Sequence, residues 1–574
     1  MSAQITLANS DLFARALYDF TLTKAERQEI VHARAKAIAM SFNFTTSDVF
    51  TCSEKFWDWG VHPINLIDVA ASALASIHVN LTIGTLSEYI ARPEVAELCR
   101  KLLAFEVSGH YMLTEVAHGL DSQNIETTAT LLEDGGFDFH TPHPGAAKFM
   151  PATIVAGGVP KMTIIMARLI VQGSDRGIRP FAVNLNDGET MCPGVSCRYG
   201  ITVSQCYQTF TQVMNRSLPD RSGTRPMGHA ITYFNHVKLP ATALIGHLET
   251  KLSPRLQFLS TIWRLGVGSA TLSGMVVPAL RISAHITAKY AKQRMVTNSA
   301  GNTASILSFR TTQAPILRAL SQAAALEAFY REIRPYFSAL DNSNLVEVLD
   351  IRNGLADVFK TVAVHHWRET SIILTDRLGA RGLFTENQLI SMEMELRGMT
   401  IAEGDVLVLC IRLASELLIG RYQLPAPRNP SSLLAMHEGK IFSEMRGIFE
   451  KLGKNHRSEE FNRILLPRCI PLVIAIGQRM AFEAALDAHV EPDLVAVYEA
   501  SAVLQDLAWY VENGLTTREV AIAKEVDALT RAFVILDQVL DKNGCEPYIH
   551  TPILSSSAWA NWVATLPLHE CAKL

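Results

Sequence analysis

The spacing of hydrophobic and polar positions changes several times along the chain, and each change predicts a different kind of element. From Leu12 to about Met112, apolar residues recur every three or four positions, as in the stretches 25–42 and 93–107. This is the period of one face of an α-helix. It predicts a helical N-terminal domain over residues 1–112.

Between about Leu113 and Gly246 the pattern consists of short runs rich in branched apolar residues. Examples are ATIVAGG at 152–158, MTIIMARLIV at 162–171 and FAVNL at 181–185, separated by glycines, prolines and Asp-Gly pairs. Such runs between turn residues are typical of strands. A compact, barrel-like β-domain is therefore predicted over residues 113–246.

Helical spacing returns after the β-domain. Long amphipathic stretches between residues 254 and 424 predict a four-helix bundle over residues 247–424. Three prolines within residues 425–430 cannot continue a helix and predict a linker over 425–432. A second helical domain is predicted over 433–574, so the fold class is mostly α with a central β-domain.

Composition narrows the class of partner. With a net charge of -4 and 19% charged residues, the chain lacks the strong positive field that nucleic acids attract, so no nucleic-acid partner is expected. The most apolar run, Leu265 to Leu280, contains three glycines and a proline and looks too short to cross a bilayer, so no membrane span is expected. No cluster with metal-ligand spacing is found, and no metal site is predicted.

The segment that starts at Tyr111 reads YMLTEVAHGLDSQNIETTATLLEDGG. It resembles the TELGHG and LETTAT segment of acyl-CoA oxidases, and Thr114-Glu115, His118-Gly119 and 126–130 match together. The chain thus resembles the superfamily of acyl-CoA oxidases and acyl-CoA dehydrogenases, and is closer to the oxidases. The resemblance implies FAD as cofactor, with Thr114 bonded to the flavin ring.

Two further segments extend the resemblance. ISAHITAKYAKQRMV at 282–296 and SILSFRTTQ at 305–313 are similar to the family's Y-x-x-x-R-R-Q and I-L-D-F-Q-T-Q-Q. The resemblance implies that Arg294 binds the FAD diphosphate, that Gln313 belongs to the cofactor site, and that the protein is a homodimer with flavin at the interface. A planar guanidinium suits two phosphate oxygens, although a lone arginine on a helix is usually a solvated surface residue.

Small residues mark two more expected cofactor contacts. RLGARGL at 377–383 stands where the family has a glycine turn against the flavin diphosphate, and Gly379 and Gly382 are retained. Ala152 lies in a segment that replaces the family's K-W-W-P-G-G and is expected to face the flavin edge. Leu383 replaces an aromatic residue of the family pattern.

The stretch MTIAEGDVLVL at 399–409 resembles the T-F-E-G-E-N-T-V stretch of the oxidases. The resemblance implies that Glu403 is the catalytic base and that Asp405 belongs to the cofactor site. The alternative for Glu403 is an exposed carboxylate at a helix start, where the helix dipole favours it.

The resemblance implies an FAD-dependent acyl-CoA oxidase that introduces an alpha,beta double bond and passes electrons to O2, giving H2O2. No side chain accepts a hydride, so a cofactor must. One alternative is an acyl-CoA dehydrogenase with an electron-transfer partner. Another is a flavin-free binding protein or scaffold, which the departures at Ala152, Ala380, Ala402 and Leu383 keep open.

Two features bear on location and substrate. The final Ala572-Lys573-Leu574 resembles the Ser-Lys-Leu address of the peroxisomal import receptor. Peroxisomal localisation is therefore expected, with a cytoplasmic location as the alternative. The segment 197–230 departs from the family's glycine-rich pattern near the thioester entrance, which suggests an unusual acyl chain on a specialised pathway.

Overall fold

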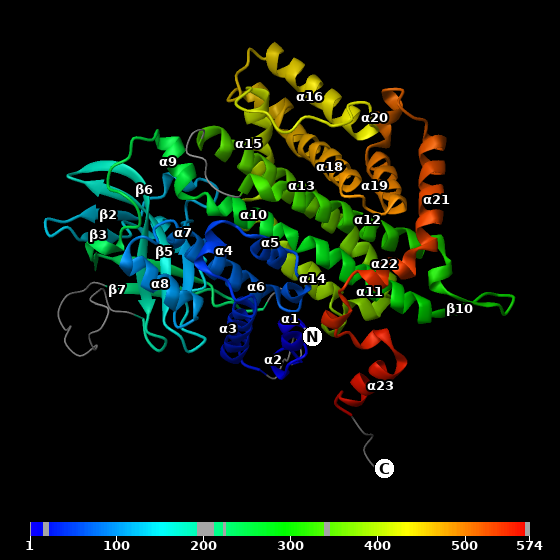
Figure 1. The fold of residues 1–574 in the computed structure, drawn as a ribbon, viewed down its shortest axis with the longest axis horizontal. Helices are drawn as coiled ribbons and strands as arrows, with labels where there is room; N and C mark the ends of the chain where they lie inside the picture. Colours follow the sequence, from blue (N-terminus) through cyan, green and yellow to red (C-terminus); the bar gives the residue numbers. More distant parts are fainter. Residues whose placement is uncertain (1, 15–21, 192–211, 222–224, 338–344, 569–574) are drawn as a thin grey trace.

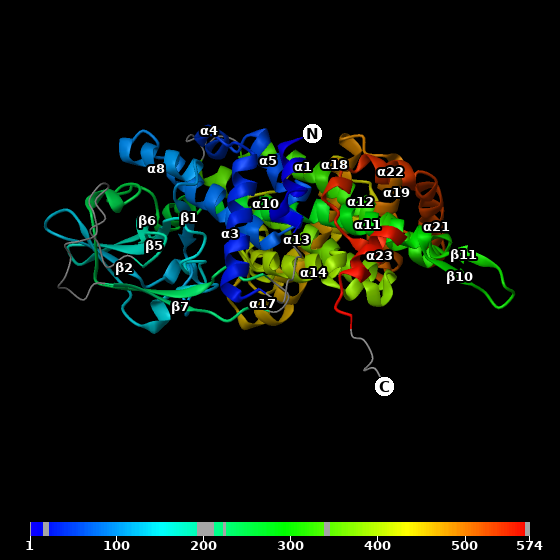
Figure 2. The same ribbon diagram turned by 90° about the horizontal axis from the view of Figure 1, so that it is seen from below.

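The computed structural model describes residues 2–14, 22–191, 212–221, 225–337 and 345–568. Figures 1 and 2 show an elongated molecule with a β-domain at one end and long helices through the middle. Further helices flank the middle ones towards the other end. The predicted fold class, mostly α with a central β-domain, is confirmed.

The N-terminal region is helical, and local caps set where its helices begin. The longest helix starts after Thr23, whose hydroxyl accepts a hydrogen bond from the N–H of Glu26 while the Glu26 carboxylate accepts from the N–H of Thr23. This reciprocal box satisfies two backbone donors. The helices are α1 (Ala3–Ala8), α2 (Asp11–Ala14), α3 (Lys24–Ser41), α4 (Thr46–Phe50), α5 (Glu54–Gly60), α6 (Val69–Ser76), the π-helix η2 (Ile77–Ile83), α7 (Gly84–Ser87) and α8 (Pro93–Leu103).

The β-domain is built around one long strand, β5. One edge of β5 pairs with β1 and then β2, both parallel, and the other edge pairs with β6 in an antiparallel hairpin. Gln172 and Gly173, both at positive φ, form the tight turn of that hairpin. The strands are β1 (Ser108–Met112), β2 (Thr128–Leu131), β3 (Phe137–His140), β4 (Lys148–Phe149), β5 (Lys161–Val171), β6 (Ser174–Asn186), β7 (Gln212–Ser217), β8 (Ala230–Asn235) and β9 (Val237–Leu239).

Two sheets make up this domain. The larger sheet runs in the order β1-β5-β2-β3-β9, with β6 on the other side of β5, and a smaller sheet runs β4-β8-β7. Aromatic side chains from three strands, Phe139, Phe181 and Phe234, pack edge to face in the shared core. The sheet starts at Ser108, before the predicted boundary at residue 112, so its first strand comes from the predicted helical domain.

The middle of the molecule is a bundle of long helices. The helices α11, α12 and α13 pack against one another, and α10 and α15 pack against α13. The elements are α9 (Pro254–Thr261), α10 (Arg264–Gly274), α11 (Val276–Gln293), β10 (Met295–Thr297), β11 (Thr303–Ser305), η6 (Ile306–Ser308), α12 (Arg310–Ile333), α13 (Leu345–Arg377), η9 (Gly379–Leu383), α14 (Leu389–Leu396), η11 (Arg397–Thr400) and α15 (Val406–Leu418).

The hairpin β10–β11 was not predicted, because residues 254–424 were expected to be helical. Its turn is set by Asn298, whose side-chain oxygen accepts from the N–H groups of Ala300 at 3.0 Å and Asn302 at 2.9 Å. Gly301 adopts a φ of +80° in the same turn. An asparagine bonded to its own following backbone competes with helix formation. The hairpin projects from the end of the molecule opposite the β-domain (Figures 1 and 2).

The C-terminal helices share a core with the bundle rather than forming a separate unit. Helix α18 lies against α12 and α13, and residues 425–430 before it contain no helix or strand. The helices are α16 (Leu433–Lys451), α17 (Glu459–Ile464), α18 (Cys469–Asp487), α19 (Pro492–Gln505), α20 (Leu507–Glu512), α21 (Arg518–Val534), α22 (Leu536–Lys542) and α23 (Ser556–Ala564).

Three helical stretches are long and apolar enough to cross a membrane by length and composition alone: Val69–Ser87, Arg264–Gln293 and Glu459–Asp487. The second of these contains the run Leu265 to Leu280, so the expectation that this run is too short was wrong. Its apolar character has another explanation, since 83% of its most apolar window is buried inside the protein. The absence of a membrane span stays a prediction.

Gly477 tests how closely α18 docks on the bundle. A Cβ on Gly477 would lie 2.7 Å from the Cβ of Val362 on α13, which is too close for two carbon atoms. We expect Gly477→Ala to lower the free energy of unfolding by roughly 1–3 kcal/mol in urea denaturation, because the two helices must move apart.

The matched control is Gly439→Ala on α16, where an added Cβ meets no atom within 4 Å. There the better helix propensity of alanine should raise stability by roughly 0.5–1 kcal/mol. Equal effects of the two substitutions would contradict the close packing of α18 on α13.

Candidate active site

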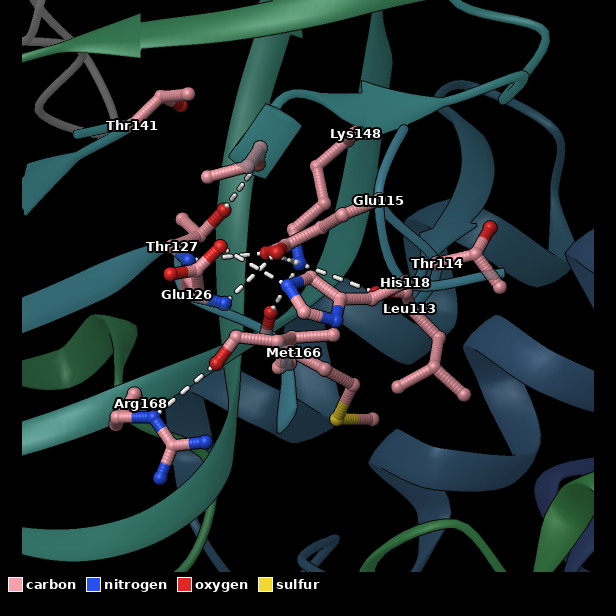
Figure 3. Close-up of polar contacts among 12 residues, drawn as sticks. Leu113, Thr114, Glu115, His118, Glu126, Thr127, Thr141, Lys148, Met166 and Arg168 are labelled. Atoms are coloured by element: carbon pink, nitrogen blue, oxygen red, sulfur yellow. Dashed lines mark hydrogen bonds and ion pairs between the residues drawn. The ribbon is translucent and has the colours of Figure 1, made fainter. Parts of the chain in front are cut away.

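Thr114 lies on a loop that interrupts one edge of the sheet. Because β1 and β2 both pair with the same edge of β5, residues 113–127 must leave that edge after β1 and return to it at β2. Figure 3 shows this loop together with the side chains that bind it. The loop carries most of the segment that predicted a flavin contact.

A fully buried ion pair holds the two ends of this loop. The Lys148 ammonium donates to a Glu115 carboxylate oxygen at 2.9 Å and to the carbonyl oxygens of Leu113 and Met166 at 3.1 and 2.8 Å. The Glu115 carboxylate also accepts from the N–H groups of Glu126 at 2.7 Å and Thr127 at 3.0 Å. Burial lowers the pKa of Lys148 to about 8, and the Glu115 carboxylate opposes that shift.

This ion pair fixes where Thr114 and Ala152 stand. The Thr114 hydroxyl donates to the carbonyl oxygen of Phe149 at 3.0 Å, and the Phe149 N–H donates to the Thr114 carbonyl oxygen, also at 3.0 Å. The hydroxyl oxygen of Thr114 therefore keeps lone pairs to accept a bond from a bound group. Ala152 follows in the same short segment and is buried.

Glu403 stands on a tight turn between η11 and α15. Its φ is +55° and that of Gly404 is +112°. Lys360 on α13 clamps this turn, since its buried ammonium donates to the carbonyl oxygens of Ala402 at 2.6 Å and Gly404. A non-glycine residue in the left-handed region costs free energy and is enriched at functional sites.

The Glu403 carboxylate points into the protein, against the backbone of α10. Its Oε2 atom lies 1.7 Å from the point where a Cβ on Gly268 would stand, so any other residue at position 268 would displace the carboxylate from this place. Oε2 is buried and has no hydrogen-bond partner among the described residues. Burial raises the pKa of Glu403 to about 8, opposed by the charges of Lys360 and Arg264. The alternative of an exposed helix-start carboxylate does not fit this geometry.

Asp405 has a local role at the same turn. Its carboxylate accepts from the N–H groups of Leu407 at 3.0 Å and Val408 at 3.3 Å, and so caps α15. This bond alone explains an acidic residue two positions after Glu403. The predicted cofactor role of Asp405 stays a prediction.

Further residues around Glu403 were missed from the sequence. Asn80 lies in the π-helix η2, and Arg264 lies at the start of α10. The Asn80 amide donates to the Arg264 carbonyl oxygen, and the Arg264 guanidinium donates to the Asn80 carbonyl oxygen, both at 3.1 Å. Tyr111 on β1 lies near enough for the Glu403 charge to add to the effect of burial in raising its pKa. The glycines inside an otherwise helical run were the one signal for a close approach at Gly268. That Glu403 and Thr114 belong to one site stays a prediction.

The other four predicted cofactor residues form a second group. Arg294 follows α11 and is exposed, and it makes no ion pair among the described residues. Gln313 is buried, and its amide donates to the carbonyl oxygens of Leu307 at 2.9 Å and Ser308 at 3.3 Å. Gln313 thus fastens the entry into α12 in this structure.

Gly379 and Gly382 lie beside that entry, since Arg377 at the end of α13 donates to the Thr311 carbonyl oxygen at 3.1 Å. A Cβ on Gly382 would lie 2.4 Å from the Thr375 carbonyl oxygen, whereas Gly379, at a φ of +60°, has open space beside it. The hairpin next to Arg294 and the β-domain lie at opposite ends of the molecule in both Figures 1 and 2. Within one chain, the second group is therefore remote from Thr114.

A cluster with metal-ligating side chains lies next to the buried ion pair. One ligand atom each of Glu115, His118 and Glu126 falls within 4.8 Å of the others. His118 and His143 both bind the Glu126 carboxylate, at 2.9 and 3.0 Å, and Glu115 is committed to Lys148 and two backbone N–H groups. The described contacts account for these side chains as a hydrogen-bonded cluster.

Two predicted features fall wholly or partly outside the described residues. Ala572-Lys573-Leu574 lies outside them, as does part of the segment 197–230. Within the described part of that segment, Arg225 is buried and binds Asp68 and the Ile67 carbonyl oxygen, the latter at 3.0 Å. Arg225 thus binds the N-terminal region just before α6.

Comparison with known proteins gives relatives of low identity. The chain is 31% identical to acyl-coenzyme A oxidase 1 of Yarrowia lipolytica over 182 residues, 31% of this chain and 24% of that protein. It is 22% identical to peroxisomal acyl-coenzyme A oxidase 3 of Homo sapiens over 366 residues, 61% of this chain and 47% of that protein. The chain thus spans about half or less of these relatives' length. No protein-family model matches it.

Solved structures match over nearly the whole chain. The crystal structure of acyl-CoA oxidase 1 from Yarrowia lipolytica gives a TM-score of 0.79 at 16% identity, covering 98% of this chain and 88% of that one. Acyl-CoA oxidase-1 of Caenorhabditis elegans, complexed with FAD and ATP, gives 0.77 at 14% identity, covering 100% and 91%. The predicted resemblance to acyl-CoA oxidases is confirmed, and the chain has their fold.

The buried ion pair yields a stability prediction. In Lys148→Met the Glu115 carboxylate loses its partner while it stays buried, so we expect the free energy of unfolding to fall by about 3–5 kcal/mol in urea denaturation. The control is Arg446→Met, which removes an exposed ion pair with Glu450 on α16. That change should cost no more than about 1 kcal/mol. A Lys148→Met protein as stable as the control would show that Glu115 needs no cation.

Proposed function

We propose that this chain is an FAD-dependent acyl-CoA oxidase, which introduces an alpha,beta double bond into an acyl thioester and delivers the electrons to O2 as H2O2. The observation that carries the proposal is the Glu403 carboxylate. It is buried, has no hydrogen-bond partner among the described residues and sits on a strained turn at the position that the family resemblance assigns to the base.

Glu403 has the properties that proton abstraction from carbon requires. A proton alpha to a thioester carbonyl needs a base whose pKa lies near the operating pH. Burial gives Glu403 a pKa of about 8, and Lys360 fixes the turn through backbone carbonyls, which leaves the carboxylate free. The backbone N–H of Glu403 is likewise unpaired among the described residues and is suited to stabilise the enolate-like oxygen.

The residues of the first group fit a flavin. Thr114 offers a hydroxyl oxygen with free lone pairs beside the Phe149 backbone. Burial, and after it the charge of Glu403, raises the pKa of Tyr111, three residues before Thr114. When bound there, FAD would supply the hydride acceptor that no side chain provides. Glu403 would hold the alpha proton at Oε2, and the ion pair of Lys148 and Glu115 would keep Thr114 in place.

Arg294, Gln313, Gly379 and Gly382 fit the same cofactor only if they come from a second copy of the chain. The second group is remote from Thr114, and the Arg294 guanidinium remains free to bind phosphate oxygens. Large apolar side chains stay exposed around this group, as expected of a surface that another copy covers. They are Met295, Val296, Phe309, Leu383 and Phe384. We therefore propose a homodimer with two shared sites.

A peroxisomal location is part of the proposal. The human relative is named as peroxisomal. Two parts of the proposal rest on the names of the relatives and on the sequence resemblance. They are that CoA carries the acyl group and that O2 accepts the electrons.

The first experiment is an absorbance spectrum of the purified protein, followed by anaerobic addition of a panel of acyl-CoAs and then of air. We expect a flavin band that bleaches with substrate and recovers rapidly in air with release of H2O2. Bleaching without rapid recovery would point to a dehydrogenase. A protein that takes up no FAD would overturn the catalytic proposal and leave a binding protein.

Glu403→Gln should bind FAD but reduce it about a hundred to ten thousand times more slowly, because an amide cannot take the proton. In the wild type, kcat/KM should rise with pH and level off above about 8, since burial keeps the carboxyl protonated at lower pH. Glu519→Gln, at an exposed site on α21, is the control and should leave both unchanged. A pH profile without this rise would contradict the role of Glu403.

The same pKa gives a readout that does not depend on activity. Because the folded state holds the Glu403 proton more tightly than the unfolded state, stability should fall as the pH rises from about 4.5 to about 8. Glu403→Gln should be more stable than the wild type at pH 8, with a smaller decline over this range. An identical decline in both proteins would show that a group other than Glu403 has the raised pKa.

Mixed oligomers test the shared site. Glu403→Gln and Arg294→Met chains should each be nearly inactive alone, but a hybrid dimer has one site with Glu403 from one copy and Arg294 from the other. Random mixing, after dissociation and reassembly, should restore about a quarter of wild-type flavin reduction. Mixing Glu403→Gln with Thr114→Val should restore none, because both residues belong to the same copy's half of the site. Equal results for the two mixtures would contradict the shared arrangement.

A further inference from the structure

The side chains of Asn80 and Glu403 meet at one point on α10. If Gly268 carried a Cβ, this atom would lie 2.6 Å from Nδ2 of Asn80 and 1.7 Å from Oε2 of Glu403. The sum of these two distances, about 4.3 Å, is the largest separation that Nδ2 and Oε2 can have. The Asn80 amide is therefore a direct neighbour of the carboxylate.

A hydrogen bond fixes the orientation of the Asn80 amide. Nδ2 donates to the backbone carbonyl oxygen of Arg264 at 3.1 Å, and an amide turned over would place its own oxygen against that carbonyl. An amide nitrogen carries two hydrogens, and this bond uses one of them. No other described residue accepts a hydrogen bond from Nδ2. Asn80 thus has one N–H to spare beside Glu403.

The Glu403 carboxylate lacks the donor that Asn80 can supply. Its Oε2 atom is buried and has no hydrogen-bond partner in the described part of the chain. A movement of at most about 1.5 Å would bring Oε2 to the usual hydrogen-bond distance of about 2.9 Å from Nδ2. Rotation about the bonds of the glutamate side chain can produce this movement without a change in the backbone.

Arg264 carries another unused donor, but this donor points elsewhere. Its Nη2 atom is buried and, like Oε2 of Glu403, has no hydrogen-bond partner among the described residues, so these two atoms do not bond to each other. A Cβ on Gly84, in α7, would lie 2.8 Å from Nη2, which places the guanidinium against that helix. Arg264 therefore acts on Glu403 through its charge, whereas Asn80 lies next to the carboxylate.

Three further titratable groups act on Glu403 or on its turn. The Lys360 ammonium, from α13, donates to backbone carbonyls of the turn, and the Asp405 carboxylate caps α15. The pKa of Tyr111, on β1, is raised by burial and then by the charge of Glu403. Both cations, Lys360 and Arg264, favour the ionised form of Glu403 by their charge and oppose the effect of burial.

We propose that Asn80 is the positioning residue of the catalytic base: its free amide N–H donates to Oε2 of the ionised Glu403 carboxylate and holds it beside Gly268. This inference rests on the proposed function, in which Glu403 takes the alpha proton. A hydrogen bond to a charged acceptor is about twice as strong as one to a neutral acceptor. The bond therefore favours the ionised form, which is the form that can act as a base. Asn80 also lies in the π-helix η2, an irregular winding that is frequent at functional sites.

The test is the pH profile of anaerobic flavin reduction, measured with the acyl-CoA that reduces the wild type fastest. Asn80→Leu has a similar shape but no donor. We expect the rise of kcat/KM to shift upward by about one pH unit, so that the variant is about tenfold slower at pH 7 and reaches the wild-type rate at high pH. An unshifted profile, or a loss of equal size at every pH, would overturn the proposal.

Asn80→Asp is a second variant of nearly identical shape. Its carboxylate cannot donate and adds a negative charge next to Glu403, so the profile should shift upward by more than in Asn80→Leu. A profile that does not shift, or shifts downward, would contradict the role of the amide.

Asn65→Leu is the matched control. Asn65 is also fully buried, its Nδ2 donates to the Trp59 carbonyl oxygen at 2.6 Å, and its Oδ1, like that of Asn80, has no partner among the described residues. We expect the control to lose stability but to keep the wild-type pH profile. A shift as large as that of Asn80→Leu would mean that the loss of any such amide moves the profile, and would reject the assignment to Asn80.

The pH dependence of stability tests Asn80 without turnover. Burial raises the pKa of Glu403 to about 8, so the wild type should lose stability as the pH rises towards 8. Without the Asn80 donor this pKa is higher still, and in Asn80→Leu the decline should continue to about pH 9. Adding Glu403→Gln should abolish this extension, and an extension that persists in the double variant would overturn the proposal.

The two readouts separate the failure of this inference from the failure of the proposed function. If no acyl-CoA reduces the flavin, the proposed function fails, and the stability profile still decides whether Asn80 bonds to Glu403. If the flavin is reduced but neither profile responds to Asn80→Leu or Asn80→Asp, only the role of Asn80 is rejected.

Discussion

The site depends first on the buried pair of Glu115 and Lys148. One edge of β5 is shared by two strands that are separated by a loop, and such a break leaves backbone groups without ladder partners. Lys148 binds one end of the loop and β5, while Glu115 binds the N–H groups at its other end. Because every charge in this arrangement is hydrogen-bonded, the pair can stay fully buried and hold Thr114 at the open edge.

The Glu403 turn has the opposite character, since it concentrates unfavourable features. Glu403 has a left-handed backbone conformation, and its buried Oε2 atom has no partner among the described residues. The same atom lies close to the backbone of α10 at Gly268, where a Cβ would displace it. Lys360 offsets part of this cost by binding the turn through its carbonyls. Placing the cation on the backbone rather than on the carboxylate keeps the base free, and burial then shifts its pKa upward.

The sequence predicted the parts of the fold that follow local patterns. The spacing of apolar residues predicted the order of helical and strand regions. The motifs around Thr114 and Glu403 marked both residues as candidates for the site. Asn80, Gly268 and Lys360 were missed because each reaches Glu403 from a different helical element, and no local spacing records that meeting. The length argument for Leu265 to Leu280 failed because α10 and α11 run on as one stretch. Local bonds explain Asp405 and Gln313 without a cofactor, so their roles remain predictions.

Sharing a site between two copies would link cofactor binding to assembly. On the proposed arrangement, each flavin contacts Thr114 of one copy and Arg294 of the other, so FAD binds the dimer more tightly than the monomer. By linkage, bound FAD then stabilises the dimer by the same free energy. The exposed apolar residues beside Arg294 would be covered only in that state. A chain whose glycine turn departs from the family pattern at Ala380 and Leu383 would rely more heavily on this coupling, because fewer of its contacts to the diphosphate come from the turn itself.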